Sequence, residues 1–123
     1  MSDKPKTIIC DIDGTLLYHH NEGVSKQVEQ TWNKLLEGTT EKFNEWDAKS
    51  YNVILITGRR ESQRRETEKQ LRDLGLFWDH LIMGTGGGDR VVINDRKPNS
   101  SRDTAYSINV DRNTGLGGIE IWE

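Results

Sequence analysis

The chain has 123 residues, a length that suits one globular domain, so we expect a single domain over residues 1–123. No stretch approaches the ~18 consecutive apolar residues of a spanning helix, which excludes a transmembrane protein, and residues 1–6 do not resemble a signal peptide. The formal net charge of -3 argues against attraction of the whole chain to nucleic acid. The single cysteine, Cys10, excludes an internal disulfide and a cysteine-based metal cage, and favours a reducing, cytoplasmic location.

Short apolar runs alternate with amphipathic stretches, which predicts an α/β domain with a mostly parallel sheet. Strands are expected at residues 7–10, 51–56, 81–83 and 91–93, with a fifth at 105–110 and an edge strand at 119–122. Helices are expected at about 24–36, from a start near Thr40 onward, and at about 60–74, where Gly75 ends the helix. We therefore expect a small three-layer α/β domain with a Rossmann-like fold.

Asp11 and Asp13 directly follow the first predicted strand, and Gly14 permits a sharp turn after them. Residues two apart in an extended chain point to the same side, so the two carboxylates can converge on one site. Two close carboxylates repel each other, which indicates a cation between them or an unusual protonation state. Taken alone, the segment also fits an ordinary turn.

Thr57 ends the second predicted strand, and Asp95 ends the fourth. Ligands of open parallel sheets bind at the carboxyl ends of the strands, where these residues join Asp11 and Asp13. A set of carboxylates without histidine or cysteine suits Mg²⁺, which prefers oxygen ligands.

With these motifs, the chain resembles the haloacid dehalogenase (HAD) superfamily of phosphohydrolases over roughly Thr7 to Pro98. The family's first motif, DxDGT, is matched by Asp11-Ile12-Asp13-Gly14-Thr15; its second is matched by Thr57, and its acidic fourth motif by Asn94-Asp95. The segment between the first two motifs is too short for an inserted cap domain. The resemblance is therefore to the small capless type, whose site is open to a large substrate or is closed over a small one by oligomerisation.

The resemblance implies a role for each matched residue. Asp11 is expected to be the nucleophile that attacks a phosphoryl group, and Asp13 the general acid and base. Thr57 is expected to hydrogen-bond a phosphoryl oxygen, in a substrate-binding turn with Gly58 and Arg59.

The resemblance also implies a Mg²⁺ cofactor held by Asp11, the backbone carbonyl of Asp13, and Asp95. The metal neutralises charge so that a carboxylate can approach a phosphate. Asn94 stands where family members often have a second aspartate, so Asp95 is the expected ligand of the pair.

The family's usual third-motif lysine is absent from residues 84–90. We expect Lys97, two residues beyond Asp95, to supply that positive charge as a catalytic residue. Arg90 and Arg59 are the alternatives.

The expected function is hydrolysis of a phosphomonoester through an aspartyl-phosphate, with a small phosphorylated metabolite such as a sugar phosphate as substrate. One alternative is a polynucleotide 3′-phosphatase, because Ile93-Asn94-Asp95-Arg96 looks similar to the Asp-Asp-Arg motif of those enzymes and residues 59–72 are rich in arginine and lysine. A second alternative is a phosphate-binding module without turnover. No membrane partner is expected, and a homo-oligomer is compatible with the sequence.

Overall fold

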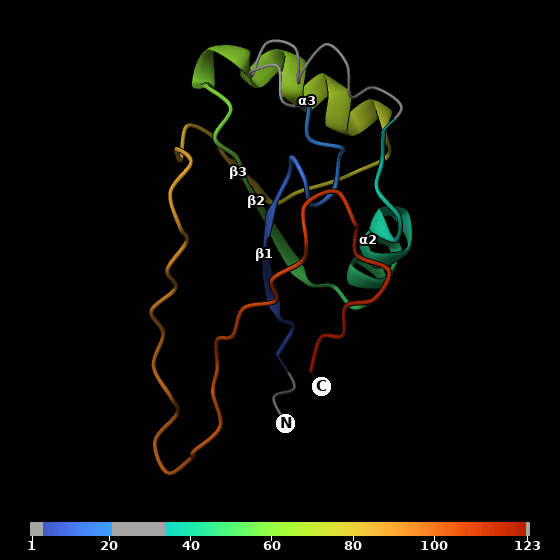
Figure 1. Cartoon of the computed structure of the whole chain (residues 1–123). Helices are drawn as coiled ribbons and strands as arrows, with labels where there is room; N and C mark the ends of the chain where they lie inside the picture. The colour runs from blue at the N-terminus through green and yellow to red at the C-terminus, as the bar shows by residue number, and fades with distance from the viewer. Residues whose placement is uncertain (1–3, 21–33, 123) are drawn as a thin grey trace.

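The computed structural model of the chain describes residues 4–20 and 34–122. In chain order the elements are strand β1 (Thr7–Asp11), helix α2 (Thr39–Ala48), strand β2 (Asn52–Ile56), the short 3₁₀ helix η1 (Glu61–Gln63), helix α3 (Arg64–Asp73) and strand β3 (His80–Ile82) (Figure 1). The three strands form one parallel sheet in the order β1-β2-β3. This arrangement confirms the α/β class with a parallel sheet.

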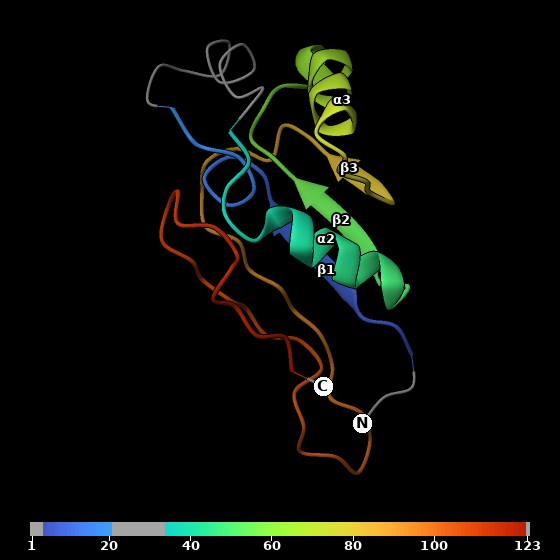
Figure 2. The same ribbon diagram turned by 90° about the vertical axis from the view of Figure 1, so that its right-hand side faces the viewer.

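One face of the sheet forms the core with the helices. Cys10 pairs with Leu55, and Leu55 with Leu81, so these three side chains lie in one row across the sheet. All three are buried, together with Phe43 and Trp46 of α2, Leu71 of α3, and Ile12, Leu16 and Leu17 from the loop after β1. Figure 2 shows α2 lying across β1 and β2.

The opposite face of the sheet is more exposed. Ile9 and Ile82, which alternate with the buried row, are 50% and 48% exposed. Residues 84–107, coloured yellow to orange, leave the end of β3, run past the sheet on the side away from α2 and project beyond its amino end (Figure 1). In the part of the chain that the structure describes, both helices therefore contribute to the core on one face of the sheet.

The predicted helix ends are partly confirmed. Gly75 has a φ of 81°, and the N–H groups of Gly75 and Leu76 bond the carbonyls of Arg72 and Leu71, so α3 ends where the sequence predicts. Helix α2 begins at Thr39, after Gly38, and Thr40 does not cap it. The Thr39 hydroxyl instead donates to the Leu16 carbonyl at 3.1 Å, which ties α2 to the loop after β1.

Three predicted strands are not formed. Residues 91–93, 105–110 and 119–122 have no strand structure, and Val91, Val92 and Ile93 are 82%, 59% and 92% exposed. An apolar run becomes a strand only where a neighbour supplies the hydrogen-bond ladder and the packing, and here residues 91–93 have neither. The helix predicted at 24–36 falls mostly outside the described residues; Leu35 forms an isolated bridge with Leu17 rather than a helical turn.

None of the described helices is both long and apolar enough to span a bilayer.

Cys10 provides a test of the core. Burial, and to a lesser extent the Asp11 charge, raises the pKa of its thiol to about 12. The thiolate is the reactive form, so we expect Cys10 in the folded protein to react with iodoacetamide at pH 8 at least 100-fold more slowly than in urea. Mass spectrometry measures the rate, and equal rates in buffer and in urea would contradict the burial of β1.

Candidate active site

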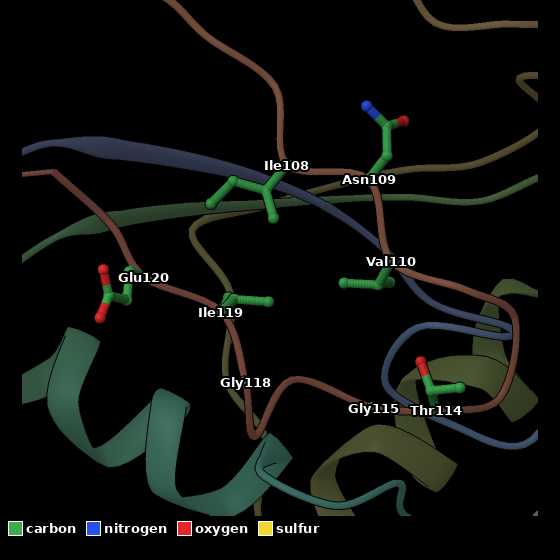
Figure 3. A pocket seen from close by; sticks show the side chains of 8 residues that line it. All are labelled: Ile108, Asn109, Val110, Thr114, Gly115, Gly118, Ile119 and Glu120. Atoms are coloured by element: carbon green, nitrogen blue, oxygen red, sulfur yellow. The ribbon is translucent and has the colours of Figure 1, made fainter.

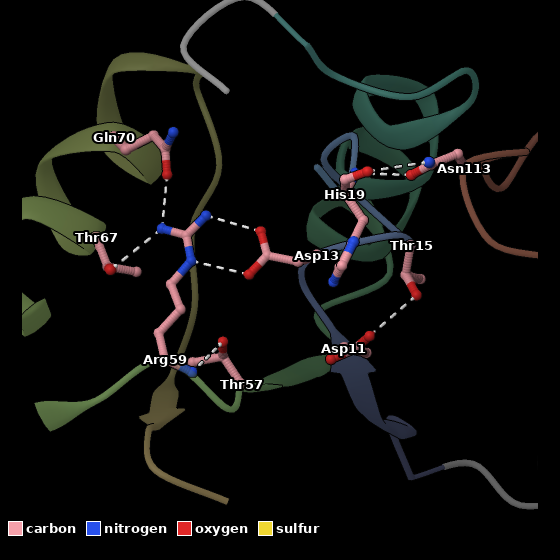
Figure 4. A network of polar contacts seen from close by, with 9 residues as sticks. All are labelled: Asp11, Asp13, Thr15, His19, Thr57, Arg59, Thr67, Gln70 and Asn113. Atoms are coloured by element: carbon pink, nitrogen blue, oxygen red, sulfur yellow. Dashed lines mark hydrogen bonds and ion pairs between the residues drawn. The ribbon is translucent and has the colours of Figure 1, made fainter. Parts of the chain in front are cut away.

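The carboxyl ends of β1 and β2 bring the residues of the first two motifs together. Asp11 is the last residue of β1 and pairs with Ile56, so Thr57 begins the turn directly beside it. The N–H of Thr57 donates to the Ile82 carbonyl of β3 at 3.0 Å, which fixes this turn at the sheet edge. Figure 4 shows Asp11, Asp13, Thr57 and Arg59 at this end of the sheet. Of the residues expected at this edge, the structure thus brings Asp11, Asp13 and Thr57 to one end of the sheet.

The loop after Asp11 is tightly wound. The N–H groups of Thr15, Leu16 and Leu17 all approach the Ile12 carbonyl at 2.8–3.2 Å, and the Thr15 hydroxyl donates to Asp11 Oδ2 at 3.4 Å. Gly14 has a φ of 91°, a conformation that disfavours any residue with a Cβ.

Asp11 lies half-buried in an electrostatically unfavourable position. Burial raises the pKa of its carboxyl above the ordinary value, and the charge of Asp13 raises it further. The backbone N–H of Ile12, the charge of Arg90 and the hydroxyl of Thr15 lower it in part. A cation beside Asp11 would relieve this repulsion.

Asp13 is held by a buried arginine. Arg59 Nε and Nη2 donate to the two Asp13 carboxylate oxygens at 2.9 and 2.7 Å, and the two side chains are only 1% and 14% exposed. Nη1 donates to Thr67 Oγ1 and Gln70 Oε1 of α3, at 3.2 and 2.7 Å (Figure 4). The guanidinium of Arg59, expected at the substrate, therefore connects Asp13 to α3 in this structure.

The Thr57 hydroxyl is oriented by its own turn. Its oxygen accepts the backbone N–H of Arg59 at 3.1 Å, so the hydroxyl proton remains available for an oxygen of a substrate. Thr85 N–H bonds the Thr57 carbonyl at 3.1 Å, and Gly84 N–H bonds the Arg59 carbonyl at 2.7 Å. A Cβ on Gly58 would lie 3.2 Å from the Gly86 carbonyl oxygen, so residues 84–88, the glycine-rich loop, pack directly against this turn.

Arg90 closes the glycine-rich loop. Its guanidinium donates to Thr85 Oγ1 at 2.9 Å and to the carbonyls of Gly86 and Gly88 at 3.1 and 2.6 Å. Its charge also lowers the pKa of Asp11, which makes Arg90 a candidate for the third-motif cation.

Asp95 and Lys97 do not lie at the end of a strand in this structure. Both belong to the exposed stretch 91–100, where Asn94 donates to Thr104 Oγ1 at 2.8 Å and Arg96 pairs with Asp103 at 2.8 Å. No group of three or more acidic, histidine or cysteine side chains in the described residues is arranged to hold a metal ion. The missing fourth strand explains this, since it would have carried Asp95 to the sheet edge.

The sequence interpretation missed the contribution of the C-terminal segment. The side chain of Asn113 bonds the backbone of His19, and its backbone N–H donates to the Gly14 carbonyl at 2.8 Å. Arg112 lies over Gly14, with Cγ 3.3 Å from the position of a Cβ there. The sequence of residues 113–115 has the composition of a turn, and a local pattern carries no signal for a contact 94 residues away.

The basic residues of α3 are largely paired on the surface. Arg64 contacts Glu61 and Glu68, Arg72 also contacts Glu68, and Lys69 contacts Asp73, all at 2.7–3.4 Å. This is the pattern of a solvated helix face with salt bridges between successive turns.

A separate hollow of about 460 Å³ lies within the C-terminal segment. Figure 3 shows that it is lined by residues 108–110, 114, 115 and 118–120, among which only Glu120 is ionisable. It contains none of the expected site residues, so we place no chemistry there.

Comparison with known proteins agrees with the family resemblance that the sequence motifs indicated. Residues 1–108 match the family model described as HAD superfamily, subfamily IIIB (acid phosphatase). An uncharacterized protein of Arabidopsis thaliana is 27% identical over 84 residues, which cover 68% of this chain and 30% of that protein.

Two solved structures are also similar. A chain in the Pnkp1/Rnl/Hen1 complex has a TM-score of 0.52 and 31% identity, covering 64% of this chain and 27% of that one. A chain in a structure described as the Pnkp1/Rnl/Hen1 RNA repair complex has a TM-score of 0.52 and 27% identity, covering 80% of this chain and 28% of that one. The chain thus spans less than a third of the length of each of these relatives.

Proposed function

Because the chain belongs to the HAD superfamily, subfamily IIIB (acid phosphatase), we propose that it is a Mg²⁺-dependent phosphomonoester hydrolase that works through an aspartyl-phosphate. The observation that best supports this proposal is the placement of Asp11 and Thr57 at the ends of paired strands, with Asp13 fixed by Arg59. The activity is assigned to one domain, residues 1–123.

In the proposed reaction an Asp11 carboxylate oxygen attacks phosphorus, and the bond from phosphorus to the leaving oxygen breaks. Asp13, protonated once the substrate is bound, gives its proton to that oxygen and takes a proton back from the water that hydrolyses the aspartyl-phosphate. This regenerates Asp11 and releases inorganic phosphate. Thr57 would donate its hydroxyl proton to a phosphoryl oxygen, and Gly58 and Arg59 complete the proposed substrate-binding turn, with the Arg59 guanidinium held on Asp13 in this structure.

The proposed ligands of Mg²⁺ are Asp11, the backbone carbonyl of Asp13, and Asp95. The raised pKa of the half-buried Asp11 fits a site built for a cation, whereas Asp95 lies in the exposed segment in this structure. When bound, the ion would reduce the repulsion between Asp11 and the phosphoryl oxygens.

We favour a small phosphorylated metabolite such as a sugar phosphate as substrate. A polynucleotide 3′-phosphatase is the second candidate, supported by the likeness to a chain of an RNA repair complex. The paired charges on α3 offer it little free positive surface.

A release assay tests this proposal. Phosphate release would be measured from sugar phosphates, other phosphorylated metabolites and a 3′-phosphorylated oligonucleotide, with Mg²⁺ and with EDTA. We expect release from a small ester that EDTA abolishes and that 50 to 200 mM salt changes little. Release only from the oligonucleotide, falling steeply with salt, would select the second candidate. Phosphate binding without release would indicate a binding module.

Substitutions can show which residue takes the role of the missing third-motif lysine. We retain Lys97 as the proposed catalytic cation and expect Lys97→Ala to lower kcat/KM about 10- to 100-fold, through lost charge stabilisation. Arg90→Ala is the comparison, since Arg90 acts on Asp11 in this structure. Unchanged turnover in Lys97→Ala together with a large loss in Arg90→Ala would transfer the role to Arg90.

A further inference from the structure

We propose that Asn113 is a positioning residue of this site, which holds the loop carrying Asp13 in its working geometry. The inference rests on the proposed function and deepens it. It gives a role in the site to Asn113, which lies outside all of the matched motifs.

Asn113 makes three hydrogen bonds to the loop after β1. Its Oδ1 accepts the backbone N–H of His19 at 2.7 Å, and its Nδ2 donates to the His19 carbonyl at 3.3 Å. Its own backbone N–H donates to the Gly14 carbonyl at 2.8 Å. One residue therefore binds Gly14, directly after Asp13, and also His19 at the far end of the same loop. Figure 4 shows the contact between Asn113 and His19.

The turn that presents Asn113 is itself fixed. Asn113 has a φ of 66°, and the Thr114 N–H and hydroxyl both bond the Asp111 carbonyl, at 3.2 and 2.7 Å. Next along the chain, Leu116 is buried and its N–H donates to the Glu37 carbonyl at 2.7 Å. A Cβ on Gly115 would lie 2.3 Å from the same carbonyl oxygen, so the backbones meet closely there.

The loop is therefore held from two sides. Arg59 fixes the Asp13 carboxylate from the α3 side, and Asn113 fixes the backbone of Gly14 and His19 from the C-terminal side. Proton transfer requires Asp13 within hydrogen-bond reach of the leaving oxygen, and small misplacements of catalytic groups are costly. Asn113 acts through the loop and need not touch the substrate.

The variant that tests this proposal is Asn113→Gly. Glycine accepts the positive φ without strain, so the substitution removes the side-chain bonds and keeps the turn. Asn109→Gly is the matched control: this exposed asparagine lies in the same segment, and among the described residues its side chain donates to Ser107 Oγ alone, at 3.5 Å. Asn113→Asp keeps an acceptor for the His19 N–H and is the conservative variant.

Two readouts are needed. We expect amide hydrogen exchange at His19 to be about 10-fold faster in Asn113→Gly and to recover in Asn113→Asp. We expect kcat to fall about 10- to 100-fold in Asn113→Gly, with KM changed less than threefold, and to recover in part in Asn113→Asp. Asn109→Gly should match the parent chain in both.

The proposal is overturned if His19 exchange is unchanged in Asn113→Gly. It is also overturned if kcat stays within twofold of the parent chain at a temperature where both are folded, because Asn113 would then be merely structural. Failure of the proposed function is distinguishable, since the parent chain itself would release no phosphate. In that case Asn113 is judged by His19 exchange, which must be about 10-fold faster in Asn113→Gly than in the parent chain and must recover in Asn113→Asp.

Discussion

Asp11→Asn abolishes phosphate release, with an expected loss of about 10³- to 10⁵-fold in kcat, because an amide cannot form the aspartyl-phosphate. The comparison is phosphate release by the parent chain and the variant under single-turnover conditions with Mg²⁺. Asp47→Asn, an exposed aspartate of α2, is the control and should leave the rate unchanged. An Asp11→Asn rate within tenfold of the parent would remove Asp11 as nucleophile.

The same variant should remain folded. Burial raises the pKa of Asp11 in the folded protein, so the folded state holds this proton more tightly than the unfolded state does. Protonated Asp11 therefore adds to the free energy of unfolding. This stabilisation is complete at acid pH and is lost as the pH rises through the pKa of Asp11 in the folded protein. Without metal, Asp11→Asn should therefore melt at a higher temperature than the parent at pH 7, and this advantage should shrink on acidification. A lower melting temperature at pH 7 would show that Asp11 serves the fold.

The buried pair of Arg59 and Asp13 gives the second large effect. Arg59→Met should lower the free energy of unfolding by about 3–5 kcal/mol, since it leaves the Asp13 carboxylate without its partner in a largely buried position. Urea denaturation measures the change. Arg64→Met is the comparison on the same side of the fold: Arg64 is 35% exposed, pairs with glutamates and donates to the Leu81 carbonyl, so the expected cost is only about 1–2 kcal/mol.

Two further variants distinguish the effect of the Arg59 charge from the effect of its paired N–H donors. Arg59→Met combined with Asp13→Leu should regain part of the lost stability, because no buried charge is then left unpaired. Arg59→Lys keeps the charge but loses the paired N–H donors, and should lower kcat by misplacing Asp13. If Arg59→Met costs no more stability than Arg64→Met, the ion pair does not organise the site.

The strand-end residues could be predicted from sequence because their placement follows from local rules. Asp11 and Thr57 each follow an apolar run, and parallel strands deliver their carboxyl ends to one sheet edge. The glycine-rich residues 84–88 follow the last strand of the sheet and pack against Gly58 at the same edge. The end of α3 at Gly75 likewise follows from a single residue's conformational freedom.

The partners of these residues could not be predicted in the same way. Arg59 and Asp13 are 46 residues apart, and Asn113 and His19 are 94 apart, so neither contact leaves a mark on local periodicity. The prediction of a strand at 91–93 was wrong for a related reason. Residues 91–93 have the composition of a strand, but a strand also needs a neighbouring strand to pair with, and composition does not specify that neighbour.

The central claim is that Asp11 receives a phosphoryl group. The most direct measurement is to mix the chain with ³²P-labelled substrate and Mg²⁺, quench with acid within milliseconds, and map the label by peptide analysis. We expect hydroxylamine-sensitive label on the peptide containing Asp11, and none in Asp11→Asn. Label on another peptide, or equal phosphate release by the parent chain and Asp11→Asn, would contradict it.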